Sequence, residues 1–427
     1  FARGAAAVME MRGKSYLSVG GVSMGIAGSF LDPLVLQRTF GMRAEWMDMS
    51  EVRRRIEGHI YDEAAYKKAH AWVRANCPQG PNYYNNNHSA AQIAKDWEFC
   101  VKMAVVIKDM MRGNQKLKEL GYPEESFGRN ALVAGFQGQR QWTDSLPNCD
   151  LAETLLSSSF DWSGARAPFT LATENDTLNG MSMLLQTLVT GQASVFCDVR
   201  TYWDNASVAR AAGERPAIAE DGFIHLNNSG AAALDGAGTM QSDGKPVMRP
   251  WWEVSEADMR GALSATTWTP ANLDYFKGGG FSAHFVTRAE MPVTMIRLNR
   301  IVGLGVTLQI AEGRTLDLPR RITDPIERRT DIGWPSTFFV PTLNGQGAFT
   351  DVYSVMAAWG ANHSAFTYGH IGDRLITLAS MLRIPVSLHN VEASRIYRPH
   401  VWSAFGGTQD PMGADYRACA AFGPLYR

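Results

Sequence analysis

Two acidic residues, Glu174 and Asp198, are the first candidates for chemistry in this sequence. Glu174 follows the apolar run of residues 168–173, and Asp198 follows the run of residues 193–197. Two carboxylates at one site can share a divalent metal ion, or they can divide the work of a general acid and a general base. They can equally be a helix cap and a strand-end ion pair, so the pattern alone leaves a purely structural role open.

The segment between the two acids predicts a helix that positions them. Apolar residues recur there at helical spacing, at Leu178, Met181, Leu184, Leu185 and Leu188. A strand–helix–strand unit of this length usually crosses over so that its two strands are parallel. The unit would then place both carboxylates at the carboxyl edge of an open α/β sheet, where such sheets bind ligands.

Two further apolar strands are predicted, at residues 15–20 and 131–136. The first leads into Gly21-Val-Ser-Met-Gly25 and then into an apolar helix expected from Ile26. This context places Ser23 either as the nucleophile of a serine hydrolase or in a glycine turn. The second leads into residues 137–144, Gln-Gly-Gln-Arg-Gln-Trp-Thr-Asp. The amides, guanidinium and indole of that segment suit hydrogen bonding to a polyol, and they also suit the start of a capped helix.

After residue 203 the sequence changes character. Glycine becomes frequent, and β-forming runs follow at residues 222–226, 293–298 and 306–310 without a βαβ rhythm. This pattern predicts an antiparallel sheet or a small barrel. The predicted fold class is therefore α/β, with a parallel α/β domain of residues 1–189 followed by a β-rich, barrel-like domain of residues 190–427. Glu174 and Asp198 would come from different domains, and the site would lie in the cleft between them.

Composition and charge exclude several classes of protein. A chain of 427 residues exceeds one typical core, so at least two domains are expected. The net charge of −1 and the absence of a basic stripe argue against nucleic acid as a partner. No apolar run approaches the ~20 residues of a membrane span. Five scattered cysteines without a CxxC pair indicate free thiols and a cytoplasmic location.

One of the nine histidines, His363, has the setting of a ligand. It follows Gly360, which is expected to end a helix, and it adjoins Asn362. We expect this setting to be exposed and polar, which suits a helix cap as well as a metal ligand. Together with Glu174 and Asp198, this imidazole would make a mostly oxygen site suited to Mn²⁺ or Mg²⁺.

Long stretches of the sequence resemble the L-fucose isomerase family, manganese-dependent aldose–ketose isomerases of bacteria. The likeness runs nearly end to end. Its motifs are residues 13–18 (Gly-Lys-Ser-Tyr-Leu-Ser), 23–28, 131–144, 172–176 (Ala-Thr-Glu-Asn-Asp), 198–203 (Asp-Val-Arg-Thr-Tyr-Trp), 278–282, 291–295, 309–313, 359–363 (Trp-Gly-Ala-Asn-His) and 377–385.

The resemblance implies a Rossmann-like domain followed by a β-rich domain, and it implies a set of site residues. It places Mn²⁺ on Glu174, Asp198 and His363, with the same two acids transferring the proton. It places the open-chain sugar against Gln137, Ser229, Tyr275, Trp334 and Asn362, with Met24 lining the pocket. The implied reaction interconverts L-fucose and L-fuculose, and also D-arabinose and D-ribulose, through a metal-bound cis-enediolate.

The resemblance also implies a hexamer and an additional N-terminal domain. In the family that domain gives an Arg and a Trp to the active site of a neighbouring subunit. Because the sequence opens at Phe1 without an initiator Met, we expect that it lacks this domain. A sugar-binding module without catalysis is therefore the main alternative. The resemblance also argues against Ser23 as a nucleophile.

Overall fold

The first half of the chain is built on a four-stranded parallel sheet in the order β2-β1-β3-β6. The structure is a computed structural model that describes residues 1–228 and 230–397. β1 (Ser15–Val19) lies between β2 (Arg43–Met47) and β3 (Ala131–Phe136), and β6 (Leu171–Ala172) pairs with β3. β1 is buried along its whole length, as expected for a parallel strand covered on both faces. The predicted parallel α/β domain is confirmed.

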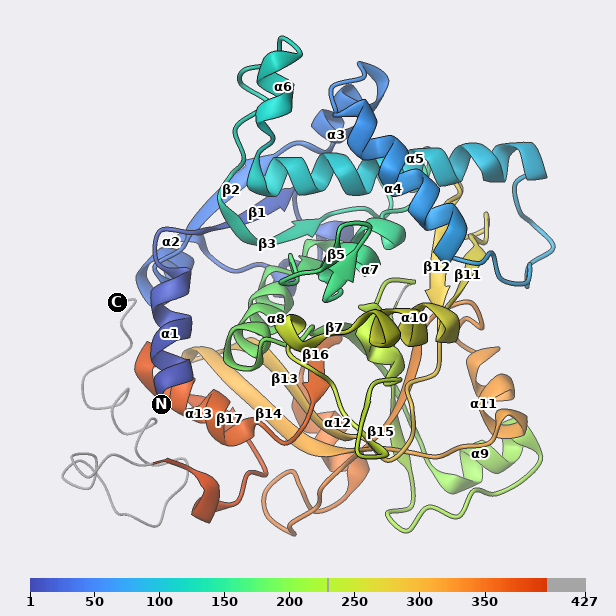
Figure 1. Cartoon of the computed structure of the whole chain (residues 1–427). Helices are drawn as coiled ribbons and strands as arrows, with labels where there is room; N and C mark the ends of the chain where they lie inside the picture. The colour runs from blue at the N-terminus through green and yellow to red at the C-terminus, as the bar shows by residue number, and fades with distance from the viewer. Residues whose placement is uncertain (229, 398–427) are drawn as a thin grey trace.

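Helices cover both faces of this sheet (Figure 1). Leu17 and Val19 join the apolar core of the α5 side, whereas Tyr16 joins the core of the α8 side, as the alternation of a strand requires. The helices of this half are α1 (Ala2–Met11), α2 (Pro33–Val35), α3 (Met49–Glu57), α4 (Glu63–Asn76), α5 (Ala90–Arg112), α6 (Gln115–Glu119), α7 (Asp150–Ser157) and α8 (Thr177–Thr190).

The second half of the chain forms a closed barrel of six antiparallel strands, which confirms the predicted β-rich domain. The strand order is β13-β16-β7-β8-β15-β14, and β13 also pairs with β14, which closes the ring. The strands are β7 (Val195–Trp203), β8 (Phe223–Asn227), β13 (Pro292–Ile301), β14 (Gly305–Thr315), β15 (Ser336–Pro341) and β16 (His363–Tyr368). β17 (Val386–Leu388) pairs in parallel with β14.

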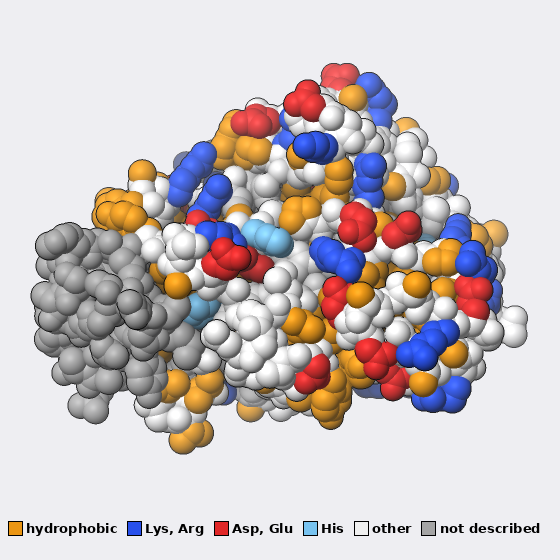
Figure 2. Space-filling view, turned by 90° about the horizontal axis from the view of Figure 1, so that it is seen from below, with side chains coloured by type: hydrophobic (Ala, Val, Ile, Leu, Met, Phe, Trp, Pro, Cys, Tyr) orange, Lys and Arg blue, Asp and Glu red, His pale blue; other side chains and the backbone are white. Residues whose placement is uncertain are grey.

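The second half of the chain contains further elements. They are α9 (Asn205–Ala212), α10 (Glu256–Ala265), α11 (Arg320–Glu327), α12 (Val352–Trp359), α13 (Gly372–Leu382) and the β11–β12 pair (Thr267–Pro270 with Phe281–His284). α10 and the β11–β12 pair contribute Leu263, Trp268 and Phe281 to the core on the α5 side of the parallel sheet. α13 packs against α1 at the left of Figure 1. In the view of Figure 2, acidic and basic side chains are interspersed over the face below the barrel. In the described part of the chain no helix is long and apolar enough to cross a membrane.

The two strands that flank α8 belong to different sheets, so the predicted parallel crossover is wrong. β6 pairs with β3 in the parallel sheet, whereas β7 pairs antiparallel with β16 and β8 in the barrel. In the barrel β7 is hydrogen-bonded to a strand on each side. If it lay beside β6 in the parallel sheet, it could pair only with a strand of two residues. α8 contacts both sheets, and every residue of it except Leu188 is buried. A domain boundary at 189/190 stays a prediction.

The segment after β1 also differs from expectation. An apolar helix from Ile26 was expected, but the chain forms two 3₁₀ turns, Ser23–Gly25 and Ala27–Ser29, before the short α2. Met24 and Gly25 both have positive φ, which no helix accommodates. The glycines that resemble a nucleophile motif therefore make a compact loop rather than a helix start.

Candidate active site

Glu174 lies in the turn between β6 and α8, at the carboxyl edge of the parallel sheet. Glu174 and Asn175 have φ of +58° and +49°, so two consecutive residues other than glycine are left-handed. The Asn175 side chain holds this turn: its Oδ1 accepts a hydrogen bond from the Tyr16 hydroxyl at 3.2 Å, and its Nδ2 donates to the Gly21 carbonyl at 2.8 Å. Strained backbone of this kind is held by its surroundings and concentrates at functional sites.

Asp198 and His363 come from the barrel. They are directly opposite each other on the antiparallel strands β7 and β16, which is the arrangement that brings cross-strand side chains into contact. His363 Nε2 lies 3.5 Å from Asp198 Oδ1 and 3.6 Å from Glu174 Oε2. The imidazole therefore faces one carboxylate from the barrel and one from the parallel sheet.

The three groups are largely withdrawn from solvent. The side chain of His363 is 3% exposed, that of Glu174 is 11% exposed and that of Asp198 is 15% exposed. The expectation that His363 stands in an exposed setting is wrong, because the residue begins strand β16 inside the barrel wall. Asn362, its neighbour, is exposed, and its Nδ2 lies 3.1 Å from His363 Nε2.

Burial and mutual charge shift the pKa values of these groups. Burial raises the pKa of Glu174, and the charge of Asp198 adds to this rise while His363 opposes it. Burial also raises the pKa of Asp198, against the opposing charges of His363 and Arg200. Burial disfavours the charged form of His363, but the hydrogen bond with Asp176 and the three nearby carboxylates outweigh it and raise the pKa of the imidazole. The protonation states of the three groups are therefore linked to one another.

The two distances to His363 Nε2 are close to those between ligands of one divalent cation. Ligands that lie about 2.1–2.3 Å from a single hard cation are separated from one another by roughly 3–3.6 Å, which matches the two distances to His363 Nε2. Among the described residues no group of three such side chains is already assembled as a metal centre. Asp198 Oδ2 pairs with Arg200 at 2.7 Å, whereas its other oxygen, Oδ1, faces His363.

An aromatic wall stands beside the acids. The rings of Tyr275 and Trp334 meet edge to face at 5.6 Å, and the guanidinium of Arg200 lies 5.6 Å from the centre of the Trp334 ring. The Tyr275 hydroxyl donates to Gln139 Oε1 at 2.6 Å. Burial and the charges of Glu174 and Asp198 raise the pKa of Tyr275 to about 12. The Tyr275 hydroxyl is therefore close enough to both acids to interact with their charges.

The remaining residues expected at the sugar lie around the same edge of the parallel sheet, or outside the described residues. Gln137 follows β3, where its Oε1 accepts a hydrogen bond from the Gly21 amide at 2.5 Å and its Nε2 donates to Gln141 at 3.2 Å. Met24 is 43% exposed in the loop after β1. Ser229 lies outside the described residues.

Ser23 does not have the surroundings of a nucleophile. Its side chain is buried, and its hydroxyl donates to the backbone carbonyl of Gln139 at 2.7 Å. A hydrolase serine requires a base that accepts this proton. The hydrogen bond instead ties the loop after β1 to the segment after β3.

Three residues of the site were missed by reasoning from the sequence. Asp176 accepts a hydrogen bond from His363 Nδ1 at 2.6 Å, Arg297 pairs with Asp176 at 2.7 Å, and Arg200 pairs with Asp198. Asp176 and Arg200 stand within the quoted motifs, two residues after Glu174 and Asp198. That spacing is a signal in the sequence, whereas Arg297 lies in an ordinary strand pattern and gives none.

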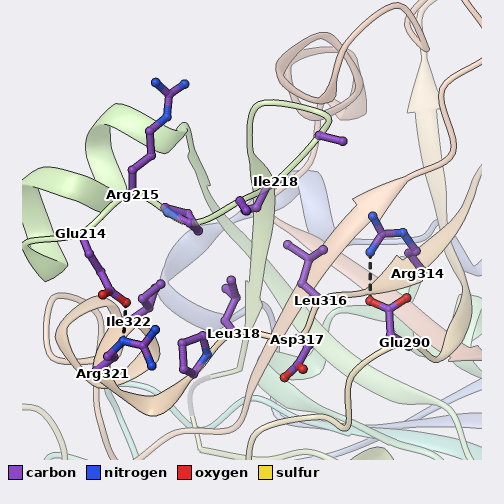
Figure 3. A pocket seen from close by; sticks show the side chains of 14 residues that line it. Glu214, Arg215, Ile218, Glu290, Arg314, Leu316, Asp317, Leu318, Arg321 and Ile322 are labelled. Atoms are coloured by element: carbon purple, nitrogen blue, oxygen red, sulfur yellow. Dashed lines mark hydrogen bonds and ion pairs between the residues drawn. The ribbon is translucent and has the colours of Figure 1, made fainter.

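A separate cavity of about 740 Å³ lies on the barrel side, away from these residues (Figure 3). Two ion pairs stand in it, Arg314 with Glu290 at 3.2 Å and Arg321 with Glu214 at 2.6 Å. Arg215 extends away from the group in Figure 3. None of the residues predicted to do chemistry lines this cavity.

The chain is similar to known enzymes along its whole length. Residues 14–191 match the family model of the L-fucose isomerase second N-terminal domain, and residues 226–390 match that of the L-fucose isomerase C-terminal domain. The L-fucose isomerase of Vibrio vulnificus is 55% identical over 428 aligned residues, which cover 100% of this chain and 73% of that enzyme.

Other relatives give the same result. The L-fucose isomerase of Bacteroides fragilis is 54% identical over 100% of this chain and 73% of its own length. The L-fucose isomerase of Haemophilus influenzae is 53% identical over 100% of this chain and 72% of its own length. The chain therefore belongs to the L-fucose isomerase family and is an aldose–ketose isomerase.

Proposed function

We propose that this enzyme interconverts L-fucose and L-fuculose, and also D-arabinose and D-ribulose, at the edge where the parallel sheet meets the barrel. One observation carries the proposal: Glu174 and Asp198, from different halves of the fold, both approach the same imidazole nitrogen of His363. The names of the relatives support L-fucose as the substrate. D-Arabinose has the same configuration as L-fucose at C2, C3 and C4.

We assign Glu174, Asp198 and His363 as the ligands of Mn²⁺. Two carboxylates and one imidazole are a mostly hard donor set, which suits Mn²⁺ or Mg²⁺ better than structural zinc. When bound, the cation supplies Lewis acidity that polarises the carbonyl group of the open-chain sugar.

The two carboxylates would also move the proton. One of them takes the proton from C2 of the aldose and a cis-enediolate of the sugar forms. A proton then returns to C1, and the proton of the O2 hydroxyl moves to O1, so that the carbonyl group passes from C1 to C2. The two acidic side chains are partly exposed, 11% for Glu174 and 15% for Asp198, so a proton held on either carboxylate can exchange with solvent. Arg200 holds Asp198 by an ion pair at 2.7 Å, whereas Glu174 has the freer carboxylate.

The sugar would lie against the aromatic wall. Trp334 is 6% exposed and packs with Tyr275, so the two rings offer an apolar face for the C–H groups of the sugar. Gln137 and Asn362 offer amides for its hydroxyls, Met24 lines the entrance, and Ser229 completes the predicted set. Such a division between an apolar wall and a few polar groups is usual for small-molecule sites.

We also propose a cytoplasmic enzyme and a hexamer. Cys77, Cys100, Cys149 and Cys197 are buried free thiols, which suits a reducing compartment. Sedimentation velocity of the purified protein would measure the state of assembly.

An isomerisation assay tests the function directly. Protein stripped with a chelator should lose turnover of L-fucose, and added Mn²⁺ should restore it. Reaction in D₂O should place deuterium at C1 of the ketose, because the proton taken from C2 exchanges with solvent. Binding of the sugar alcohol fucitol without any turnover of L-fucose would favour a sugar-binding module instead, and complete retention of the C2 hydrogen would favour a hydride shift.

A further inference from the structure

Asp176 joins three elements at a fully buried point beneath the candidate site. Its Oδ2 accepts hydrogen bonds from His363 Nδ1 at 2.6 Å and from Arg297 at 2.7 Å. Its Oδ1 accepts the backbone amide of Asn179 at 2.9 Å, which caps α8. The side chain of Asp176 is 0% exposed and that of Arg297 is 1% exposed. One carboxylate thus links α8, the barrel strand β16 and the barrel strand β13.

The hydrogen bond to Asp176 decides which nitrogen of His363 carries the proton. A carboxylate only accepts hydrogen bonds, so Nδ1 must donate and the neutral imidazole keeps its proton there. Nε2 then presents its lone pair to Glu174 and Asp198, at 3.6 and 3.5 Å. The Asn362 amide, 3.1 Å away, is placed to donate to the same lone pair.

Arg297 explains why the buried carboxylate can stay ionised. An isolated buried anion is costly unless a cation and hydrogen bonds compensate it. Arg297 supplies that cation from β13, and its Nε has no hydrogen-bond partner among the described residues. A buried arginine with an unsatisfied nitrogen contributes little to the stability of the fold. Its pairing with Asp176 therefore points to a role in positioning the Asp176 carboxylate.

We propose that Asp176, held in place by Arg297, is a positioning residue that fixes His363 as the Nδ1–H tautomer, with Nε2 facing the two carboxylates. The tautomer is a property of the chain alone. The benefit for cation binding rests on the proposed function. Capping of α8 is a separate task, because it uses the other oxygen of the same carboxylate.

Asp176→Asn separates the two tasks. Asparagine caps helices about as well as aspartate, so its carbonyl oxygen can keep the bond to Asn179. Its NH₂ group then faces His363 and Arg297 and donates to Nδ1. The imidazole proton must move to Nε2, where it blocks the lone pair that faces Glu174 and Asp198.

Imidazole ¹⁵N NMR of the metal-free protein, at a pH where the imidazole is neutral, measures the tautomer. His363→Gln identifies the resonance by its loss. We expect the Nδ1–H tautomer in the unaltered protein and a majority of the Nε2–H tautomer in Asp176→Asn. An Nε2–H tautomer in the unaltered protein, or the same tautomer in both proteins, would overturn the proposal. The first of these results needs no variant to fold.

Titration with Mn²⁺, with the free ion counted by electron paramagnetic resonance, gives the second readout. Loss of a hydrogen-bond partner behind a ligating histidine typically costs about 10–100-fold in metal affinity, and we expect that loss in Asp176→Asn. Asp351→Asn makes the same change at the cap of α12, and its affinity should stay within about twofold. A tautomer change with equal Mn²⁺ affinity in all three proteins would support the positioning role and contradict the assigned metal site.

Arg297→Lys tests the support of Asp176. Lysine keeps the positive charge but loses the planar guanidinium that reaches the carboxylate. If Arg297 positions Asp176, this variant should show a mixture of both His363 tautomers while circular dichroism reports a folded protein. An unchanged, single Nδ1–H tautomer would remove Arg297 from the proposal.

Discussion

The candidate active site and the cavity of Figure 3 both contain acids beside arginines, but they differ in burial. In the cavity, Glu290 is 62% exposed and Arg321 is 70% exposed. At the site, His363 is 3% exposed and Glu174 is 11% exposed. Exposed ion pairs are screened by water and contribute little, whereas buried carboxylates interact strongly with one another and with any bound cation.

The two regions also differ in charge balance. Arg314 pairs with Glu290 and Arg321 pairs with Glu214, so two acids of the cavity have arginine partners. At the candidate site Asp176 and Asp198 have arginine partners, whereas among the described residues Glu174 pairs with no arginine or lysine and lies 3.6 Å from His363. The burial of its acids therefore distinguishes the candidate site from the cavity, which is distinguished by its volume.

Glu174→Gln should produce the largest loss of activity, and the matched change in the cavity should produce almost none. The amide keeps the size of the side chain but removes the negative charge and the capacity to take a proton. Because the residue is assigned both to the cation and to proton transfer, we expect kcat/KM for L-fucose to fall by about 10³-fold or more. The matched change in the cavity, Glu290→Gln, should leave kcat/KM within about twofold. A large loss in Glu290→Gln would show that the cavity belongs to the catalytic unit.

The pH dependence of Mn²⁺ binding should be the next largest effect. The pKa values of Glu174, Asp198 and His363 are all raised in the metal-free protein, so protons compete with the cation. Metal ligands bind in their deprotonated forms, and a lower pH therefore favours the protonated, empty site. We expect affinity to fall about 10–100-fold from pH 8 to pH 6.

Calorimetry checks this effect. Titrations in buffers of different ionisation enthalpy count the protons released with each Mn²⁺, and the site predicts net release near neutral pH. Affinity that stays constant over this range would mean that the cation does not bind at these three groups.

Tyr275→Phe should have a smaller effect, on substrate binding. The change removes the hydroxyl that donates to Gln139 at 2.6 Å but keeps the ring that packs on Trp334. The proposed function places this hydroxyl against the sugar, and loss of one hydrogen bond to the sugar costs about 0.5–1.5 kcal/mol. We therefore expect KM for L-fucose to rise about two- to tenfold with kcat nearly unchanged. Tyr353→Phe, at an exposed tyrosine of α12, is the control. An unchanged KM would place the sugar away from Tyr275.

Much of the fold could be predicted from the sequence. The spacing of apolar residues and the positions of glycines indicate strands, helices and turns from neighbouring residues alone. The predictions of residues 15–20 and 131–136 as strands agree with β1 and β3, and the helix predicted between Glu174 and Asp198 agrees with α8. The crossover around α8 failed for a physical reason. Regularly spaced apolar residues show that a strand or helix is buried, but they do not show which sheet the strand joins.

The site was predictable only in part, for a related reason. Glu174 and Asp198 end apolar runs and His363 follows a helix-ending glycine, so each could be noticed from its neighbours in the sequence. Arg297 gave no such signal, because its role comes from a contact with Asp176, 121 residues away. The burial of His363 was also missed, since barrel closure depends on pairing with β7 and β13 rather than on local sequence.

The smallest effect concerns stability, at a buried acid next to the site. Glu153 of α7 is 4% exposed and accepts a hydrogen bond from Thr173 at 3.0 Å. Burial raises the pKa of Glu153 to about 8, whereas an unfolded glutamate titrates near about 4.3. Between these values the folded chain binds more protons than the unfolded chain, so the stabilising contribution is complete below about pH 4 and is lost as pH rises towards 8.

Glu153→Gln removes this pH dependence because the amide stays neutral and can still accept from Thr173. Each pH unit between the two pKa values costs the unaltered protein about 1.4 kcal/mol. The melting temperature of the metal-free variant should therefore rise relative to the unaltered protein by about 2–4 °C between pH 5 and pH 7. Glu290→Gln, at the exposed acid of the cavity, should show no such divergence. If the melting temperatures of both variants follow that of the unaltered protein at every pH, then burial does not change the protonation of Glu153. The difference drawn between buried and exposed acids would then be wrong.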